Sequence, residues 1–192
     1  MANFAISNGK TRANEGGLAN SSADRGRLTY RGIASAIWPG WIGWPTVRKV
    51  LDQCSGNIAA ADAILNKDVA LQSQVNDFFK KNFWDVYGLD GVNDQFIADE
   101  IYDSGVNLGV VVESKFLQRA LNITNRNQKL YPDLVVDGVI GAQTLATLNN
   151  HPNKKLVLKI LNVLQGARYI SIAEADVTQE VFIESWFSRV AI

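Results

Sequence analysis

The spacing of apolar residues is the feature that most restricts what this chain can fold into. After a candidate N-cap at Asp68, apolar side chains recur at four-residue steps: Leu71, Val75, Phe79 and Phe83. Steps of this length place side chains on one face of an α-helix, and aspartate is a preferred N-cap residue. Long alternations of apolar and polar residues, which indicate strands, are missing from the sequence. The chain is therefore predicted to be mainly α.

Three further stretches are predicted to be helical. One is marked by Phe116, Leu117, Ala120 and Leu121. In the second, over 156–172, nearly every side is apolar, which predicts a helix buried among its neighbours. The last begins near Asp176 or Thr178 and has apolar residues on one face: Phe182, Trp186 and Val190. Arg189, near its end, suits the negative end of the helix dipole.

Residues 16–33 are the exception to the helical pattern. Turn-forming residues crowd the first half of this stretch, and Leu28, Thr29 and Tyr30 can form a short strand. We expect a small β-hairpin or an extended loop here. A softer boundary falls at 88–93, between two helical stretches. We therefore expect two modules, 1–90 and 93–192, packed against each other as one globule.

Composition narrows the chemistry that the chain can perform. It contains 19 Lys plus Arg and 19 Asp plus Glu, so it has no basic excess with which to bind nucleic acid. Its single cysteine, Cys54, excludes an internal disulfide, and its single histidine, His151, leaves almost nothing for a zinc site or a Ser/His/Asp triad. We expect no metal or organic cofactor. Carboxylates are the main source of acid–base chemistry.

The N-terminus has no basic segment followed by an apolar one, so no signal peptide is visible. No run approaches the roughly 18 apolar residues of a membrane span, and we expect no membrane insertion. We also expect synthesis in the cytoplasm, with any action outside the cell depending on another route of export or release. A monomer is favoured.

Glu15, which precedes Gly16 and Gly17, is the strongest candidate for a general acid. A helix over roughly 3–15 would end there, and its dipole would disfavour the ionised carboxylate. A carboxyl group that stays protonated near neutrality can protonate a leaving oxygen. A hairpin could bring Asp24 and Thr29 to face it over a cleft. Glycoside hydrolysis commonly needs such a set, in which a second group positions water or stabilises the oxocarbenium ion. The plainer interpretation is that Glu15 only ends an exposed helical turn.

The residues of this segment resemble the signature of glycoside hydrolase family 108, a family of lysozyme-like muramidases. The matching positions are Glu15, Gly16, Gly17, Asp24, Gly26, Thr29, Tyr30, Gly32 and Ile33. The second half resembles the family's usual companion, the predicted peptidoglycan-binding domain, at Asp103, Val106, Asn107, Gly109, Leu117, Gln118, Asp137, Gly138, Ile140, Gly141, Thr144, Leu145, Glu184, Trp186 and Arg189. Relatives of this kind include secretion activator proteins. Leu18 replaces the usual tyrosine, and Arg25 and Arg27 flank Gly26 where a second glycine is common.

The resemblance implies a lysozyme-like, mainly α fold and an activity on peptidoglycan. Glu15 would be the acid that cleaves the β-1,4 bond after N-acetylmuramic acid. Asp24 and Thr29 would position water or stabilise the developing positive charge. The glycan strands of the wall would be the partner, and the protein would act in the periplasm or outside the cell.

Four further residues are candidates for binding the substrate: Tyr30, Trp41, Asp103 and Asn107. Trp41 belongs to a run of three indoles, with Trp38 and Trp44, that could form the floor of a glycan groove because sugar rings pack on aromatic faces. The same indoles could instead cover the core. Asp103 and Asn107 share a helix face if the helix extends that far, where they would line the cleft or form side-chain caps.

Two other functions remain open from the sequence. A lytic transglycosylase needs the same acid but excludes water, so it releases 1,6-anhydro products. A non-catalytic peptidoglycan-binding or secretion-assisting protein could have kept the fold without the activity.

Overall fold

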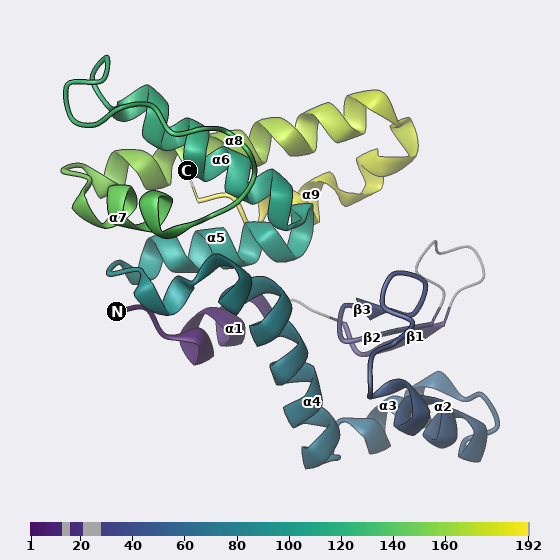
Figure 1. The fold of residues 1–192 in the computed structure, drawn as a ribbon. Coiled ribbons are helices and arrows are strands. Elements are labelled where there is room, and N and C mark those ends of the chain that lie inside the picture. Colours follow the sequence, from purple (N-terminus) through teal and green to yellow (C-terminus); the bar gives the residue numbers. More distant parts are fainter. Residues whose placement is uncertain (13–15, 21–27, 192) are drawn as a thin grey trace. The chain divides into compact units, whose positions relative to one another are not determined.

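The structure is a computed structural model that describes residues 1–12, 16–20 and 28–191. The helices are α1 (Phe4–Arg12), α2 (Trp44–Gln53), α3 (Ile58–Leu65), α4 (Val69–Phe79), α5 (Gln95–Leu108), α6 (Val110–Thr124), α7 (Ala142–Asn150), α8 (Lys154–Ala175) and α9 (Ile183–Phe187). The strands are β1 (Leu18–Asn20), β2 (Leu28–Tyr30) and β3 (Ile33–Ala34). Short helical turns are η1 (Lys80–Trp84, a π-helix), η2 (Asp85–Tyr87), η3 (Leu89–Gly91) and η4 (Val177–Phe182). The predicted mainly α fold with one small hairpin is confirmed (Figure 1).

The chain forms two compact units. Asn8–Asn82 make up the hairpin unit, and Met1–Ser7 together with Phe83–Ile192 make up the helical unit. The modules expected from the sequence were 1–90 and 93–192; the compact units differ because the first seven residues pack with the second half of the chain. Ala2 donates its backbone N–H to the Val92 carbonyl at 2.7 Å, and the Ser7 hydroxyl donates to Asp99 at 2.5 Å.

In the hairpin unit, the described strands form one antiparallel sheet in the order β1-β2-β3. Leu18 pairs with Tyr30, and Tyr30 pairs with Ile33 across the next turn. That turn consists of Arg31 and Gly32, which both have positive φ angles, 47° and 81°. Such turns suit the twist of a hairpin, and glycine adopts them without strain.

Helix α4 carries the apolar pattern that dominates the sequence. The Asp68 carboxylate accepts the Leu71 N–H at 3.0 Å, as predicted for an N-cap. Leu71, Val75 and Phe79 are all buried, which confirms the predicted face. In η1, which directly follows, Phe83 is buried as well.

In the helical unit, α5, α6 and α8 pack against one another (Figure 1). Helix α8 is longer than predicted, and the expectation of burial on every side is wrong for it: Leu156, Val163 and Ile170 are exposed. Its buried face includes Asn162 and Gln165. By length and composition alone α8 could cross a membrane, a test that core helices of soluble proteins also pass.

The predicted C-terminal helix is shorter than expected. Asp176 caps the 3₁₀ turn η4 by accepting the Thr178 N–H at 3.1 Å, and the α-helix α9 begins only at Ile183. Phe182 and Trp186 stack at 5.8 Å, whereas Val190 follows the end of the helix. A 3₁₀ turn has three residues per turn, so the expected four-residue face does not extend through this segment.

Two glutamates are buried in the helical unit, Glu100 on α5 and Glu113 on α6. Burial, and then the nearby Asp103 carboxylate, raise the pKa of Glu100 from 4.5 to about 8, against a hydrogen bond with Asn162 that lowers it. Burial also raises the pKa of Glu113 well above its ordinary value. Both carboxyl groups therefore favour the protonated form in the folded protein.

These raised pKa values predict that the protein loses stability as the pH rises from about 4.5 to about 8. The folded state holds the Glu100 proton up to about pH 8, whereas the unfolded chain releases it near 4.5. One such group changes the free energy of unfolding by at most about 1.4 kcal/mol per pH unit. Urea unfolding across this range should give a shallower decline for Glu100→Gln than for the wild type. The exposed Glu180→Gln should decline like the wild type, and an unchanged slope in Glu100→Gln would refute the prediction.

Candidate functional site

Of the predicted catalytic residues, the structure describes Thr29; Glu15 and Asp24 lie outside the described residues. Thr29 is the central residue of β2 and pairs with Ala19 on β1 and Ala34 on β3. Successive side chains on a strand point to opposite faces. Because Tyr30 points into the core, Thr29 lies on the other face of the sheet and is half-buried.

The segment that follows Glu15 is held by one carboxylate from α3. Asp62 accepts the Leu18 N–H at 2.8 Å, and the Gly17 carbonyl accepts the Arg31 N–H at 3.1 Å. A Cβ atom at Gly17 would overlap the Asp62 carboxylate. Glycine at this position therefore allows the backbone to approach Asp62.

Asp62 also connects the start of β1 to the β2–β3 turn. The Asn66 amide donates to Asp62 at 2.8 Å, and the Asn66 Oδ1 atom accepts the Arg31 Nη2–H at 2.7 Å and its Nε–H at 3.2 Å. This polar chain fixes to α3 the end of the sheet where Leu18 pairs with Tyr30. It therefore holds the backbone of Gly17 and Leu18 beside Arg31.

Gly17→Ala should disrupt this anchor, whereas Gly16→Ala should not. The new methyl group would force Asp62 away from the Leu18 N–H, at a cost of about 1–3 kcal/mol for the lost hydrogen bond. At Gly16 a Cβ atom meets no other atom within 4 Å. Thermal unfolding of both variants checks this, and equal stability of the two would contradict the role given to Asp62.

Tyr30, predicted to bind substrate, is instead a core residue. Its side chain has no exposed surface, and its hydroxyl accepts a hydrogen bond from the Gln72 amide at 2.8 Å. The ring stacks on Trp41 with 6.3 Å between centroids. The motif position of Tyr30 is thus explained by packing beneath the sheet, and a side chain buried in this way has no surface for a ligand.

The three indoles of the tryptophan run have different environments. Trp44 begins α2 and is buried in the core, where its Nε1–H donates to the Trp38 carbonyl at 2.7 Å. Trp41 is 8% exposed and meets Trp44 edge to face at 5.2 Å. Trp38 is half-buried, and with Trp41 it lines a pocket of about 370 Å³ within the hairpin unit. Trp44 therefore covers the core, whereas Trp38 lines a pocket, and glycan binding by this run stays a prediction.

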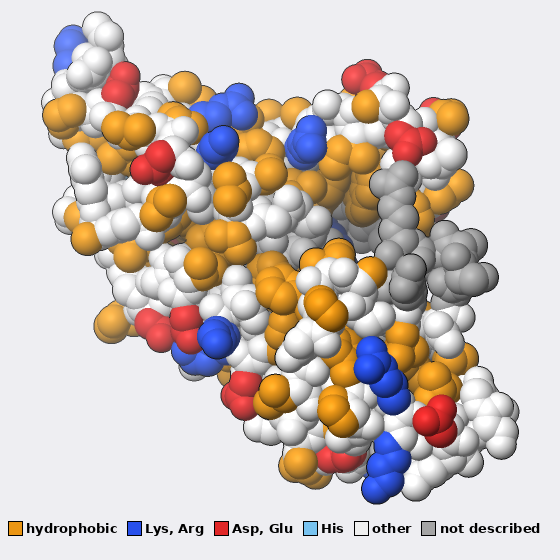
Figure 2. Space-filling view, turned by 45° about the vertical axis from the view of Figure 1, so that its right-hand side comes forward, with side chains coloured by type: hydrophobic (Ala, Val, Ile, Leu, Met, Phe, Trp, Pro, Cys, Tyr) orange, Lys and Arg blue, Asp and Glu red, His pale blue; other side chains and the backbone are white. Residues whose placement is uncertain are grey.

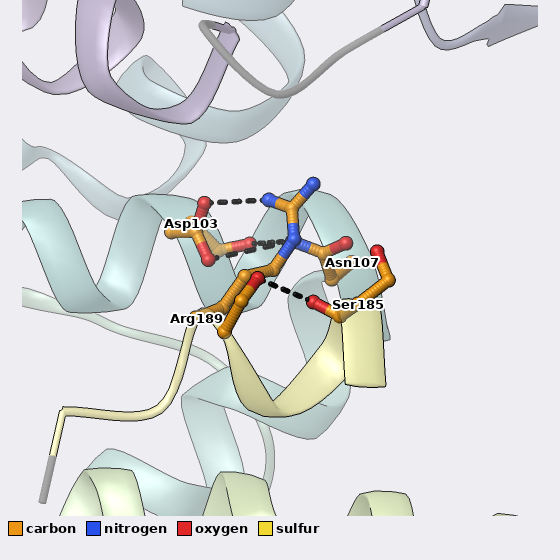
Figure 3. Close-up of polar contacts among 5 residues, drawn as sticks. Asp103, Asn107, Ser185 and Arg189 are labelled. Atoms are coloured by element: carbon orange, nitrogen blue, oxygen red, sulfur yellow. Dashed lines mark hydrogen bonds and ion pairs between the residues drawn. The ribbon is translucent and has the colours of Figure 1, made fainter. Parts of the chain in front are cut away.

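Asp103 and Asn107 lie on α5 in the helical unit, where they share a helix face as expected. Arg189 donates to the Asp103 carboxylate at 2.9 Å, and the Asn107 amide donates to the Asp103 carbonyl at 2.8 Å (Figure 3). Arg189, expected to interact with a helix dipole, thus forms an ion pair with a residue 86 positions earlier. These contacts support the capping alternative for Asn107.

The second-half motif around Asp137 forms a turn that leads into α7, with Gly141 at its N-cap. Gln118 on α6 holds this turn: its amide donates to Asp137 at 2.7 Å and its oxygen accepts the Gly138 N–H at 2.9 Å. Gly138 has a φ of 84°. The hydrogen bond from Gln118 is the main cause that lowers the pKa of Asp137. The motif therefore has a structural role within the helical unit.

Within the described ranges, no group of three or more His, Cys, Asp or Glu side chains could hold a metal ion. The histidine singled out from the sequence, His151, is buried after α7, and its Nδ1 accepts the Asn153 N–H at 3.0 Å. Cys54 is half-buried.

Comparison with known families identifies the chain. Residues 9–109, more than half of the sequence, match the family described as glycosyl hydrolase 108. The chain belongs to the glycosyl hydrolase 108 family. Residues 112–191 of this family member match the family described as a predicted peptidoglycan domain. Both matches confirm the resemblance found in the sequence, and they make the chain a peptidoglycan-related glycoside hydrolase by family.

A solved structure shares the fold of this glycosyl hydrolase 108 member. Brucella abortus SagA matches 97% of this chain and 88% of its own chain, with a TM-score of 0.62 and 22% sequence identity. At this identity the likeness shows the fold alone. Among curated proteins, none is significantly similar in sequence.

Sequence reasoning did not find the anchor residues Asp62, Asn66 and Gln72. One signal was present: Asp62 is the only charged residue in the otherwise apolar helix α3, Ile58–Leu65. An acid in such a helix needs a partner when it is half-buried. Its partner, the Leu18 backbone, is 44 residues away and belongs to the hairpin.

Proposed function

We propose that the protein is a muramidase that hydrolyses the β-1,4 bond between N-acetylmuramic acid and N-acetylglucosamine in peptidoglycan. The observation that carries the proposal is the ordered pair of family matches, glycosyl hydrolase 108 over 9–109 and a peptidoglycan domain over 112–191. The first range contains Glu15, Asp24 and Thr29, the residues that match the family signature.

In this proposal Glu15 is the general acid that protonates the leaving glycosidic oxygen. Asp24 and Thr29 assist by positioning water or by stabilising the oxocarbenium-like transition state. The anchoring of Leu18 by Asp62 and the central place of Thr29 in the sheet support this assignment, because a catalytic set needs a rigid backbone around it. No step requires a cofactor.

The partner in this proposal is the glycan strand of the wall, which the protein meets in the periplasm or outside the cell. On the face drawn in Figure 2, Lys and Arg are interspersed with Asp and Glu, and neither sign gathers into a patch. With a net charge of zero, attraction to anionic wall polymers would not drive binding. Specific recognition of the sugar residues would have to supply the binding free energy.

Digestion of purified peptidoglycan, with the products resolved by mass spectrometry, tests the proposal. A muramidase should release disaccharide-peptides with reducing N-acetylmuramic acid ends. Products with 1,6-anhydro ends would instead identify a lytic transglycosylase. Binding to insoluble peptidoglycan without any soluble product, on several wall types, would overturn the enzyme and leave the wall-binding function, which the match over 112–191 favours.

A further inference from the structure

The Trp38 pocket, as we name the 370 Å³ pocket of the hairpin unit, has the size and composition of a small-ligand site. Residues 37–42 form one wall, and α4 continued by η1 forms the other. Pockets for small ligands commonly measure about 300–1,000 Å³ and combine an apolar lining with a few placed polar groups. Six of the lining residues supply indole rings or polar side chains: Trp38, Trp41, Gln74, Asp77, Lys81 and Asn82.

The aromatic side of the pocket is held in place before any ligand binds. The Trp38 indole meets Phe78 edge to face, with 4.9 Å between centroids and an interplanar angle of 86°. The Trp38 backbone is fixed through the hydrogen bond from Trp44. Beside this indole, Ile37 and Ile42 are 69% and 70% exposed. A rigid aromatic face with apolar neighbours suits a ligand that has an apolar face of its own, as a sugar ring has.

The opposite side of the pocket is polar and has no net charge. Gln74, Asp77 and Lys81 follow one another at helical spacing along α4 and η1, and Asn82 comes directly after Lys81. The π-helical turn η1 supplies Lys81 and Asn82, and the Asn82 amide donates to the Phe78 carbonyl at 2.8 Å. π-helical turns are rare in proteins, and those that occur are often found at functional sites. The Asp77 carboxylate, the Lys81 ammonium group and two amides suit a neutral ligand with many hydrogen-bond donors and acceptors. They suit a polyanion or a lipid chain less well.

Two buried atoms of the lining have no hydrogen-bond partner among the described residues, the Trp41 Nε1–H and the Gln74 Oε1. The first is a donor and the second is an acceptor. An acetamido group is complementary to this pair, because its carbonyl accepts, its N–H donates and its methyl group suits an apolar wall. Both atoms are covered, so the Trp41 and Gln74 side chains would each have to shift to reach a ligand.

We infer that the Trp38 pocket is a subsite for one N-acetylhexosamine residue of a glycan strand. The sugar ring lies on Trp38, and its acetamido group binds Trp41 and Gln74. Asp77, Lys81 and Asn82 face the ring hydroxyls. The inference rests on the proposed function, since it names the part of the substrate that this unit would recognise.

Titration with N,N′,N″-triacetylchitotriose, followed by NMR of the full-length protein, tests the subsite. The Trp41 indole N–H resonance should shift on binding. Trp38→Ala should weaken binding by about tenfold, which is the upper range for one aromatic contact. Ile64→Ala, a change of a half-exposed apolar residue on α3 outside the pocket, should bind like the wild type. Equal affinity of Trp38→Ala and the wild type would overturn the inference.

Two further measurements test the acetamido group itself, and they hold even if Trp38→Ala does not fold. Cellotriose has the same ring and linkage without acetamido groups, and it should bind at least about tenfold more weakly. Gln74→Leu should remove most of this preference. Equal affinity for the two trisaccharides in the wild type would refute the assignment of Trp41 and Gln74.

The subsite and the muramidase proposal can fail separately. Trp38-dependent binding of chitotriose by a protein that releases nothing from peptidoglycan would refute the hydrolase and retain the subsite. Release of reducing muropeptides at the same rate by wild type and Trp38→Ala, without a shift of the Trp41 resonance, would refute the subsite and retain the hydrolase.

Discussion

Glu15→Gln should lower the rate of peptidoglycan hydrolysis by about 10²–10⁴-fold, the range that general acid catalysis commonly contributes. The substitution keeps the size of the side chain and removes the proton that the leaving oxygen needs. Binding to insoluble peptidoglycan should change little, because the amide can still occupy the same space. The rate of release of reducing ends, measured at saturating substrate, checks this prediction.

A matched substitution separates the loss of an acid from the loss of any glutamate. Glu174→Gln changes an exposed residue of α8 and should hydrolyse like the wild type. If Glu15→Gln keeps wild-type activity, Glu15 is not the acid. If Glu15→Gln is also less stable than the wild type and binds peptidoglycan less well, its loss of activity would result from disrupted folding. Unfolding curves of both variants should therefore be measured alongside their activity.

Arg189→Met should destabilise the folded protein by about 3 kcal/mol, the lower range for breaking a buried ion pair. Methionine keeps most of the apolar stem and removes the charge. The Arg189 and Asp103 side chains are only 9% and 19% exposed, so water screens their interaction weakly. The Asp103 carboxylate lies near Glu100 and Glu113 and raises the pKa of both. Without the Arg189 guanidinium, the positive charge that partly offsets this carboxylate is lost.

A double-mutant cycle distinguishes the ion pair from simple loss of packing. Asp103→Asn combined with Arg189→Met should cost clearly less than the sum of the two single changes, by at least about 1 kcal/mol. The exposed Lys155→Met, at the start of α8, should have little effect. Additive losses in the cycle would show that the pair contributes nothing as a pair.

Sequence patterns predict those parts of the fold that depend on residues close together in the chain. The Asp68 cap and the buried face of α4 depend on positions at most eleven apart, and both were predicted. The turn at Asp137 and the start of α7 follow equally from a short motif. Helices α2 and α3 were not predicted, although Pro45 and Asn57 are recognised start signals.

Features that depend on distant partners could not be predicted. Asn162 is buried on α8 because its Oδ1 accepts the Ala191 N–H at 2.6 Å, 29 residues further on. Its neighbours in sequence give no hint of this, so apolar composition suggested a helix buried all round. Tyr30 was likewise expected to bind a ligand because of its place in the motif. Its hydroxyl is instead bonded by Gln72, which is 42 residues away in sequence.

The packing of Met1–Ser7 with Phe83–Ile192 has a consequence for how the protein is made. Residues 1–7 of the helical unit are synthesised first, and the whole hairpin unit follows. The helices against which residues 1–7 pack are synthesised only after that. Phe4 must wait for Trp84 and Tyr102, its ring neighbours at 5.6 and 5.8 Å. Native contacts across such a separation form slowly because a long loop has to close first. The hairpin unit can therefore complete its fold during synthesis, while Phe4 lacks its ring neighbours until η1 and α5 have been synthesised.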